Sequence, residues 1–156
     1  MADDEEHNSN MRDYNYLVSE YTNLEEKYKV FKIEYLRLMK LAVSVGDTLS
    51  HITSTVELCD HNYEHIKSKF QEYKNYHITG TLFNSSFTMN RMRLFTRILK
   101  RTTEVLDNTR NDMHDYYVKY YAPIEAQQQQ DKIQNYTYIL LGAVVLFGAY
   151  YLRYYY

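Results

Sequence analysis

Proline, glycine, cysteine and tryptophan are scarce in this sequence of 156 residues, which contains one proline, four glycines, one cysteine and no tryptophan. β-Sandwiches and doubly wound folds need frequent turns, and glycine and proline supply most of them. The single cysteine, Cys59, cannot form an internal disulfide, which is typical of a protein in a reducing compartment. A net charge of −2 gives no support for nucleic-acid binding. The class that remains is all-α.

The longest uncharged segment lies near the C-terminus. From Ile133 to Leu152 there are 20 residues without a charge, and a helix of that length rises about 30 Å, the thickness of a hydrocarbon core. Tyrosines flank the segment on both sides, as expected at the headgroup level. We therefore predict a transmembrane helix over residues 133–153, followed by a tyrosine tail over 154–156. The central anchor residues are Tyr138, Ile139, Leu140, Leu141, Gly142, Val144, Val145, Leu146 and Phe147.

The orientation of this anchor follows from the charges around it. The first residues of the chain are acidic, whereas a signal peptide needs a basic start. Lys119 and Lys132 precede the span and only Arg153 follows it, which favours a cytosolic location for the preceding residues. We expect a tail-anchored, single-pass protein whose glycosylation sequons at Asn84 and Asn135 are unused.

A long heptad pattern precedes the anchor. Apolar residues recur at alternating steps of three and four from Tyr14 to His77, which predicts a coiled-coil-like helix over residues 13–78. Gly46 suits the C′ position of one helix and Asp47 the N-cap of another. The sequence therefore leaves open whether this helix is continuous or bends near Gly46 to form a three-helix bundle. The residues expected at the seam with a partner helix are Leu17, Leu24, Phe31, Leu38, Val45, Leu49, Ile52, Val56, Ile66 and Phe70.

Four further segments complete the predicted organisation. Residues 1–12 form an acidic flexible N-terminus, and residues 79–90 form a loop in which the heptad pattern is lost. Residues 91–122 form a basic amphipathic helix that stops before Pro123, because proline disfavours helix in the residue preceding it. Residues 123–132 form a polar linker, and the sequence leaves open whether this linker is helical and continues into the span. The second amphipathic helix is expected to pack with the long helix as a hairpin or bundle.

The charges beside the seam disfavour one mode of pairing. A parallel homodimer in register would place Glu20 against Glu25 and Lys27 against Lys32 of its partner. Both contacts are repulsive, by a few tenths of a kcal/mol each, on the order measured for helix-surface pairs. An antiparallel hairpin or a heteromeric partner avoids the repulsion.

One short motif carries possible chemistry. His61, Glu64 and His65 match the H-x-x-E-H pattern of zinc hydrolases, in which two histidines bind the metal and the glutamate is the base. In the heptad, however, both histidines take the most solvent-exposed positions. We expect no enzyme activity and no cofactor, and we interpret Cys59 as a small core residue.

Several cations gather at the start of the second amphipathic helix. Arg93, Arg97, Lys100 and Arg101 fall within about a 100° arc of it, opposite most of its apolar residues. Such a basic face can be solvated, or it can bind anionic lipid or an acidic partner.

The order of a long heptad segment and a C-terminal anchor resembles that of the tail-anchored membrane-fusion (SNARE) proteins. The chain departs from them at Ala42, Val45 and Leu49, where a central Gln or Arg layer would stand.

From the predicted anchor and the long heptad segment, we expect a non-enzymatic tether or assembly scaffold that binds a bilayer and helical protein partners. The alternatives are a structural protein of a virus particle, bridging an internal membrane and a protein shell, and the zinc-dependent hydrolase.

Overall fold

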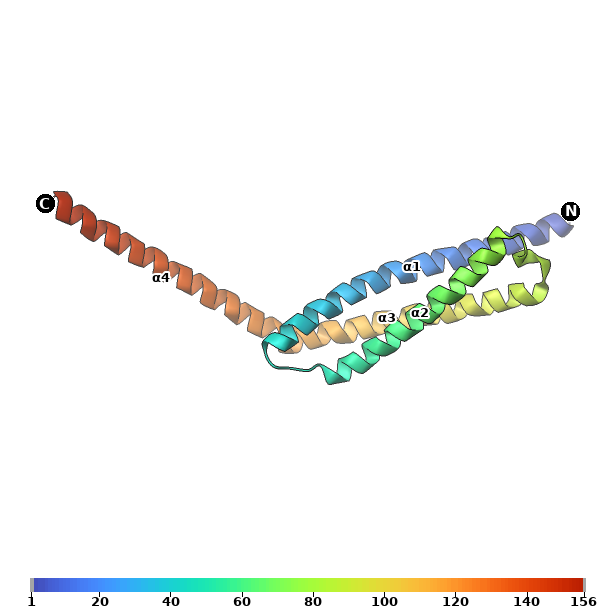
Figure 1. Ribbon diagram of the computed structural model, residues 1–156, viewed down its shortest axis with the longest axis horizontal. Helices are drawn as coiled ribbons and strands as arrows, with labels where there is room; N and C mark the ends of the chain where they lie inside the picture. The colour runs from blue at the N-terminus through green and yellow to red at the C-terminus, as the bar shows by residue number, and fades with distance from the viewer. Residues whose placement is uncertain (1, 156) are drawn as a thin grey trace. The chain divides into compact units, whose positions relative to one another are not determined.

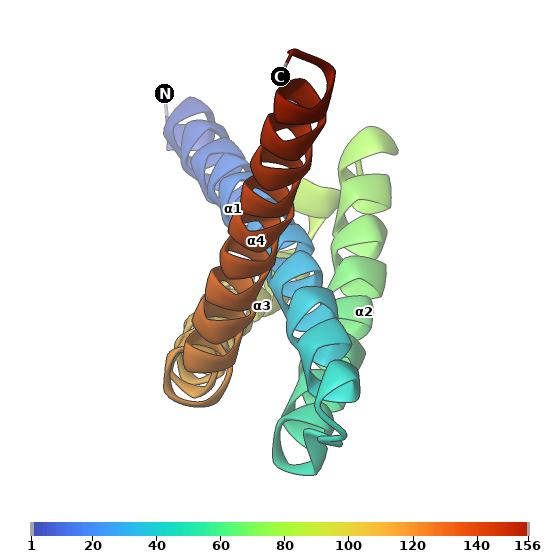
Figure 2. The ribbon, with the colours of Figure 1, turned by 90° about the vertical axis from the view of Figure 1, so that its left-hand side faces the viewer.

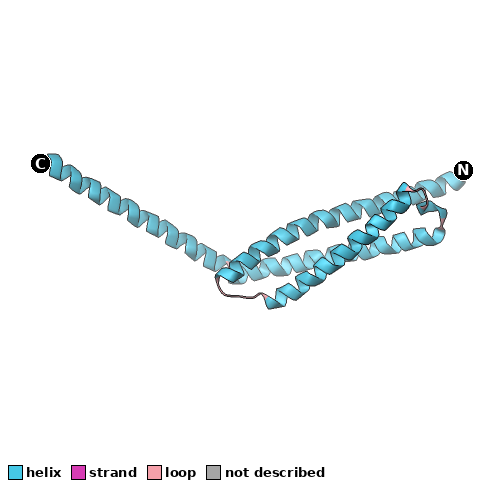
Figure 3. Cartoon of the chain, viewed as in Figure 1, coloured by secondary structure: helices cyan, strands magenta, loops and turns pink. Residues whose placement is uncertain are grey.

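The computed structural model describes residues 2–155. Met1, the first residue of the predicted acidic segment, and Tyr156, the last residue of the predicted tyrosine tail, lie outside the described residues. Within the described range the chain contains no strand, and the predicted all-α class is confirmed. Helices and short loops alternate along the chain (Figure 3). The elements are α1 (Ala2–Ser44), α2 (Ser50–Ile78), the 3-10 helix η1 (Leu82–Asn84), α3 (Ser86–Tyr120) and α4 (Ala122–Tyr155).

The chain divides into two compact units, Met1–His114 and Asp115–Tyr156. In the first unit, α1, α2 and most of α3 lie side by side (Figure 1 and Figure 2). The connection from α1 to α2 and the connection from α2 to α3 each reverse the direction of the chain, so α1 and α3 run parallel and α2 runs against both. This unit is a three-helix bundle.

The predicted helix over residues 13–78 is two helices, because the chain turns at Gly46. Gly46 has a left-handed φ of 74°, and its N–H donates to the Val43 carbonyl while the Asp47 N–H donates to the Ala42 carbonyl. These two bonds form a Schellman motif, which ends α1 by satisfying its last carbonyls. Asp47 is not the N-cap expected from the sequence. Its carboxylate accepts a bond from the Leu49 N–H at 3.1 Å, and Leu49 is the residue that precedes α2.

A second Schellman motif ends α2. Gly80 has a φ of 72°, the Gly80 N–H donates to the His77 carbonyl, and the Thr81 N–H donates to the Tyr76 carbonyl. The loop predicted over residues 79–90 is shorter than expected, since α3 already begins at Ser86. Leu82 of η1 is fully buried and closes this end of the core.

Two other segments predicted outside the main helices are helical in the structure. The N-terminal segment predicted to be flexible is helical from Ala2 onward, and Asn10 within it is buried. The polar linker predicted over 123–132 belongs to α4, which begins at Ala122. Tyr121 alone separates α3 from α4. Pro123 stands in the first turn of α4, where its missing N–H is tolerated.

The pairing of α1 with α2 is built on stacked aromatic rings. Tyr21 stacks on Phe70 with ring centroids 3.8 Å apart, and Tyr28 stacks on Tyr63 at 3.7 Å. One heptad earlier on α1, the Tyr14 ring stacks on His77 at 4.0 Å. In each pair the two residue numbers sum to 91, so a step of seven along α1 matches a step of seven back along α2. The tyrosines of the heptad thus pack within the chain, and this repeat fixes the antiparallel register.

The core face of α3 contains threonines whose hydroxyls are satisfied locally. The hydroxyl of Thr96 donates to the Met92 carbonyl, that of Thr103 to Leu99, and that of Thr109 to Val105. Such bonds to the carbonyl four residues back let a hydroxyl be buried in a helix. In the described part of the chain, no buried side-chain nitrogen or oxygen lacks a hydrogen-bond partner. The bundle is therefore a closed core.

Candidate functional site

The first candidate site is the apolar part of α4. All the central anchor residues predicted from the sequence are exposed to solvent. Among the large apolar ones, the exposed fraction of the side chain ranges from 56% at Leu141 to 76% at Phe147. The helix is long and apolar enough to cross a membrane, and none of its most apolar stretch is buried by protein. Exposed apolar side chains around a whole helix are unfavourable in water and favourable in lipid.

The polar residues at the start of this span bond within the helix. The Thr137 hydroxyl donates to the Ile133 carbonyl at 2.9 Å, and the Gln134 amide donates to the Tyr138 hydroxyl at 3.3 Å. At the other end the rings of Tyr150 and Tyr154 lie 4.6 Å apart. Polar groups and tyrosines thus lie at the ends of the apolar stretch, where the headgroups of a bilayer would receive them.

The junction between α3 and α4 is held by local bonds. The Tyr121 N–H donates to the Tyr117 carbonyl, and the Glu125 N–H donates to the Tyr121 carbonyl. The Tyr117 hydroxyl donates to the Glu125 carboxylate at 2.5 Å. The helical bond pattern therefore continues past Tyr121, although Pro123 cannot donate to the carbonyl four residues before it.

The second candidate site, the seam for a partner helix, lies inside the chain itself. Nine of its ten residues are buried in the bundle core; Leu17, Phe31 and Leu49 have no exposed surface. The exception is Val45, which is 41% exposed because it belongs to the turn after α1. The other buried members are Leu24, Leu38, Ile52, Val56, Ile66 and Phe70.

The charges beside this seam also have partners in the same chain. Lys27 pairs with Asp107 of α3 at 2.5 Å, and Lys32 pairs with Asp60 of α2 at 2.7 Å. The Tyr28 hydroxyl donates to the other oxygen of Asp60 at 2.7 Å. Burial raises the pKa of Tyr28, and this hydrogen bond to a carboxylate raises it further.

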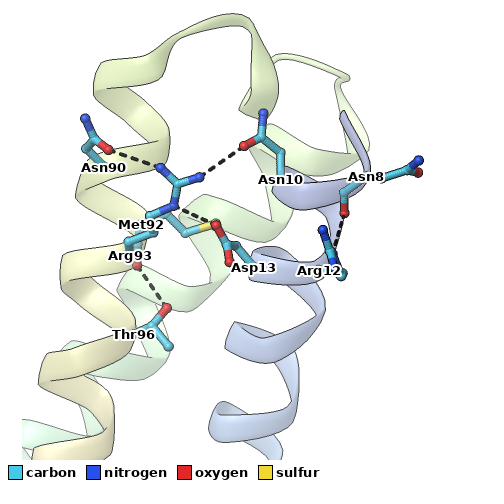
Figure 4. A network of polar contacts seen from close by, with 8 residues as sticks. All are labelled: Asn8, Asn10, Arg12, Asp13, Asn90, Met92, Arg93 and Thr96. Atoms are coloured by element: carbon cyan, nitrogen blue, oxygen red, sulfur yellow. Dashed lines mark hydrogen bonds and ion pairs between the residues drawn. The ribbon is translucent and has the colours of Figure 1, made fainter. Parts of the chain in front are cut away.

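The third candidate site is the basic face of α3, and the structure divides it. Arg93 is engaged with α1, as Figure 4 shows: its guanidinium pairs with Asp13 at 2.6 Å and donates to Asn10 at 3.2 Å. A third bond joins it to Asn90 of its own helix. Arg97, Lys100 and Arg101 are exposed on α3. Arg93 therefore belongs to the α1–α3 contact, and the other three cations are available to a ligand.

An exposed apolar stripe runs along α3, about 90° around the helix from the centre of the basic face. Phe87, Leu94, Ile98 and Val105 fall within about a 40° arc of the helix, and they are 67%, 56%, 52% and 45% exposed. The structure shows that these residues point away from the core, whose α3 members include Met92 and Leu99. We call Phe87, Leu94, Ile98 and Val105 the outer stripe.

The residues of the zinc-hydrolase pattern do not meet in a cleft. His61, Glu64 and His65 are all exposed on α2, and Glu64 alone of the three lines the groove between α1 and α2. Among the described residues, no group of three His, Cys, Asp or Glu side chains could hold a metal ion. Cys59 is buried with its sulfur 3.8 Å from the Thr109 hydroxyl, and burial raises the pKa of its thiol, which disfavours the reactive thiolate.

An open groove of about 880 Å³ lies between α1 and α2. The stacked rings of Tyr14, Tyr21 and Phe70 contribute to its lining, together with Glu25 and Lys67.

Comparisons with known proteins add no family to this description. No protein-family model matches the sequence, and searches of curated proteins and of solved structures find no match to the chain.

Proposed function

We propose that this protein is a membrane-anchored tether or assembly scaffold, in which α4 crosses a bilayer and the three-helix bundle is held at the membrane surface. The observation that carries the proposal is the exposure of α4, where apolar side chains cover the helix on all sides without protein to bury them. Lipid is the solvent that such a helix requires, because its backbone bonds are already satisfied within the helix.

The properties of the bundle support a binding role over an enzymatic one. Its core is closed, its polar groups are satisfied, and its charged seam residues pair internally. What it offers to other molecules is its outer surface. A scaffold of this kind presents a preformed helical surface to partners at the membrane, and the bundle faces the cytosol because Lys119 and Lys132 precede the span.

The anchor is tested by alkaline carbonate extraction of the full chain expressed in cells. We expect the wild-type protein to stay with the membranes. Leu141→Arg with Val145→Arg should release it, since each arginine at the centre of a span disfavours insertion by about 3 kcal/mol. The matched control is Gln128→Arg with Gln129→Arg, which adds the same charge to exposed residues before the span. Release of the wild-type chain by carbonate would refute the anchor.

The same sample reports the orientation through Asn84. This asparagine begins an Asn-Ser-Ser sequon and is exposed in η1, so it would be glycosylated if the bundle were in the lumen of the secretory pathway. We expect no mass shift between the wild type and Asn84→Gln on a gel. A shift that glycosidase removes would place the bundle in the lumen and contradict the cytosolic orientation.

A further inference from the structure

The outer stripe of α3 is a second apolar surface that the described residues leave uncovered. From Phe87 to Val105 its members span 19 residues, a rise of about 27 Å along the helix. Their exposed fractions, from 45% to 67%, are close to those of the α4 residues. A continuous stripe of this length differs from the scattered single apolar residues that are normal on a protein surface.

Cations border the outer stripe on both sides. Arg91 lies about 40° from Phe87 around the helix, with its guanidinium 5.6 Å from the Phe87 ring. Arg101 and Arg97 lie on the opposite side, both exposed, at about 40° and 80°. Between Phe87 and Val105 the sequence contains five basic residues and only one acidic residue, Glu104. On α3 the surface is thus apolar along its centre and positive at its borders, and Lys69 and Glu72 of α2 adjoin its end at Phe87 and Arg91.

This combination suits an anionic bilayer better than a second copy of the chain. Two such stripes packed against each other would bring their arginines together, and like charges in contact are repulsive. On a lipid surface, apolar side chains enter the boundary of the acyl chains while arginines contact phosphate groups.

We propose that the outer stripe of α3, with Arg91, Arg97 and Arg101 at its borders, binds the surface of a bilayer containing anionic phospholipid. This inference deepens the proposed tether function by giving the bundle its own membrane contact in addition to the α4 anchor. The bound lipid surface can belong to the membrane that α4 crosses or to a second membrane, because the chemistry of the contact is the same.

A single tryptophan reports this contact, because the natural chain has none. The full chain carrying Ile98→Trp, which we call the stripe reporter, is reconstituted into phosphatidylcholine vesicles. Brominated phosphatidylserine is placed either in those vesicles or in added protein-free vesicles. We expect the indole emission of the stripe reporter to shift to the blue and to be quenched in at least one arrangement, and to be unchanged with phosphatidylcholine alone.

The matched control for the stripe reporter is Leu58→Trp on α2, which we call the α2 reporter. The natural leucine at this position is 57% exposed, close to the 52% of Ile98. The two reporters therefore begin from similar exposure and differ in the surface on which the indole lies. The emission of the α2 reporter should not respond to phosphatidylserine.

Charge reversal tests the arginines. Each cation near an anionic surface strengthens binding about fivefold, so Arg97→Glu with Arg101→Glu should weaken the response of the stripe reporter at least about 25-fold in a phosphatidylserine titration. The control Lys67→Glu with Lys74→Glu makes the same charge change at exposed α2 positions and should leave the affinity within about twofold, since neither lysine borders the stripe.

Two results would overturn the inference. Equal responses of the two reporters would mean that the stripe has no special affinity for lipid, and a response to polyglutamate but not to phosphatidylserine would assign the surface to an acidic protein. The anchor is tested separately, by carbonate extraction of the full chain from neutral vesicles. Release of the chain there would mean that α4 is not inserted. An inserted α4 with a silent stripe reporter refutes only this inference, whereas a responsive stripe reporter with a released α4 refutes only the anchor.

Discussion

Phe31 and Phe147 are the same residue type in the two units of the chain, yet one has no exposed surface and the other is 76% exposed. Phe31 lies on α1 and is enclosed by the neighbouring helices of the bundle, whereas Phe147 lies on an α4 face that the described protein leaves open. The helices around both residues are regular. The two units therefore differ in what receives their apolar side chains, and for α4 we propose that lipid does so.

The largest effect that separates the two units is expected from alanine at these positions. Phe31→Ala should lower the free energy of unfolding of the bundle by about 3–5 kcal/mol, because it leaves a cavity in a closed core. Phe147→Ala should change it by less than about 0.5 kcal/mol, as expected for an exposed residue outside the core. Urea unfolding of the full chain in detergent micelles, followed by the near-ultraviolet circular dichroism of tyrosine, measures both. Similar losses for the two variants would mean that α4 packs as part of the core.

The second effect is a loss of bundle stability at alkaline pH. Burial raises the pKa of Tyr21 and Tyr28 in the folded chain, while an unfolded tyrosine titrates near pH 10, about its reference value. The neutral rings therefore stabilise the bundle fully below about pH 10, and this contribution is lost as pH rises toward the folded-state pKa. Within that window each tyrosine reduces the free energy of unfolding by about 1.4 kcal/mol per pH unit.

Urea unfolding repeated between neutral pH and the alkaline limit of the assay tests this slope. The double variant Tyr21→Phe with Tyr28→Phe should reduce the slope of the free energy of unfolding against pH by the contribution of about two protons. Tyr16→Phe is the control, because Tyr16 is 49% exposed. An unchanged slope in the double variant would contradict the assignment. The same effect helps the interpretation of carbonate extraction. Alkaline pH weakens the bundle, so protein that stays with the membranes under these conditions is held there by α4.

The smallest effect concerns the charges that set the pairing of helices. Lys32→Glu should lower the free energy of unfolding by about 1 kcal/mol, since it replaces a partly exposed ion pair with Asp60 by two carboxylates. The loss should be the same at low and high protein concentration, because both partners belong to one chain. Lys67→Glu, at an exposed position of α2, is the control. A midpoint that rises for Lys32→Glu, and rises more at high concentration, would instead indicate a parallel homodimer.

Much of the local structure could be predicted from the sequence because helical periodicity and apolar composition are local properties. The apolar heptad from Tyr14 to His77 predicted helices, and Gly46 marked the position where they separate. The uncharged stretch after Lys132 predicted the helix that is long and apolar enough to cross a membrane. Helix ends were less predictable, since the N-terminal turns of α1 depend on Asn10 and Asp13 bonding to Arg93, eighty residues away.

The sequence by itself determined that the chain is helical, that its heptad face needs a partner and that α4 suits a membrane. Only the tertiary structure decided which surfaces meet. A heptad seam is equally apolar whether its partner is another chain or its own, because hydrophobic contact is not directional. The fold back at Gly46 brings Tyr21 onto Phe70 and Lys32 to Asp60, and it commits the seam to the interior. It also leaves the outer stripe of α3 exposed, and that exposure depends on how three helices pack.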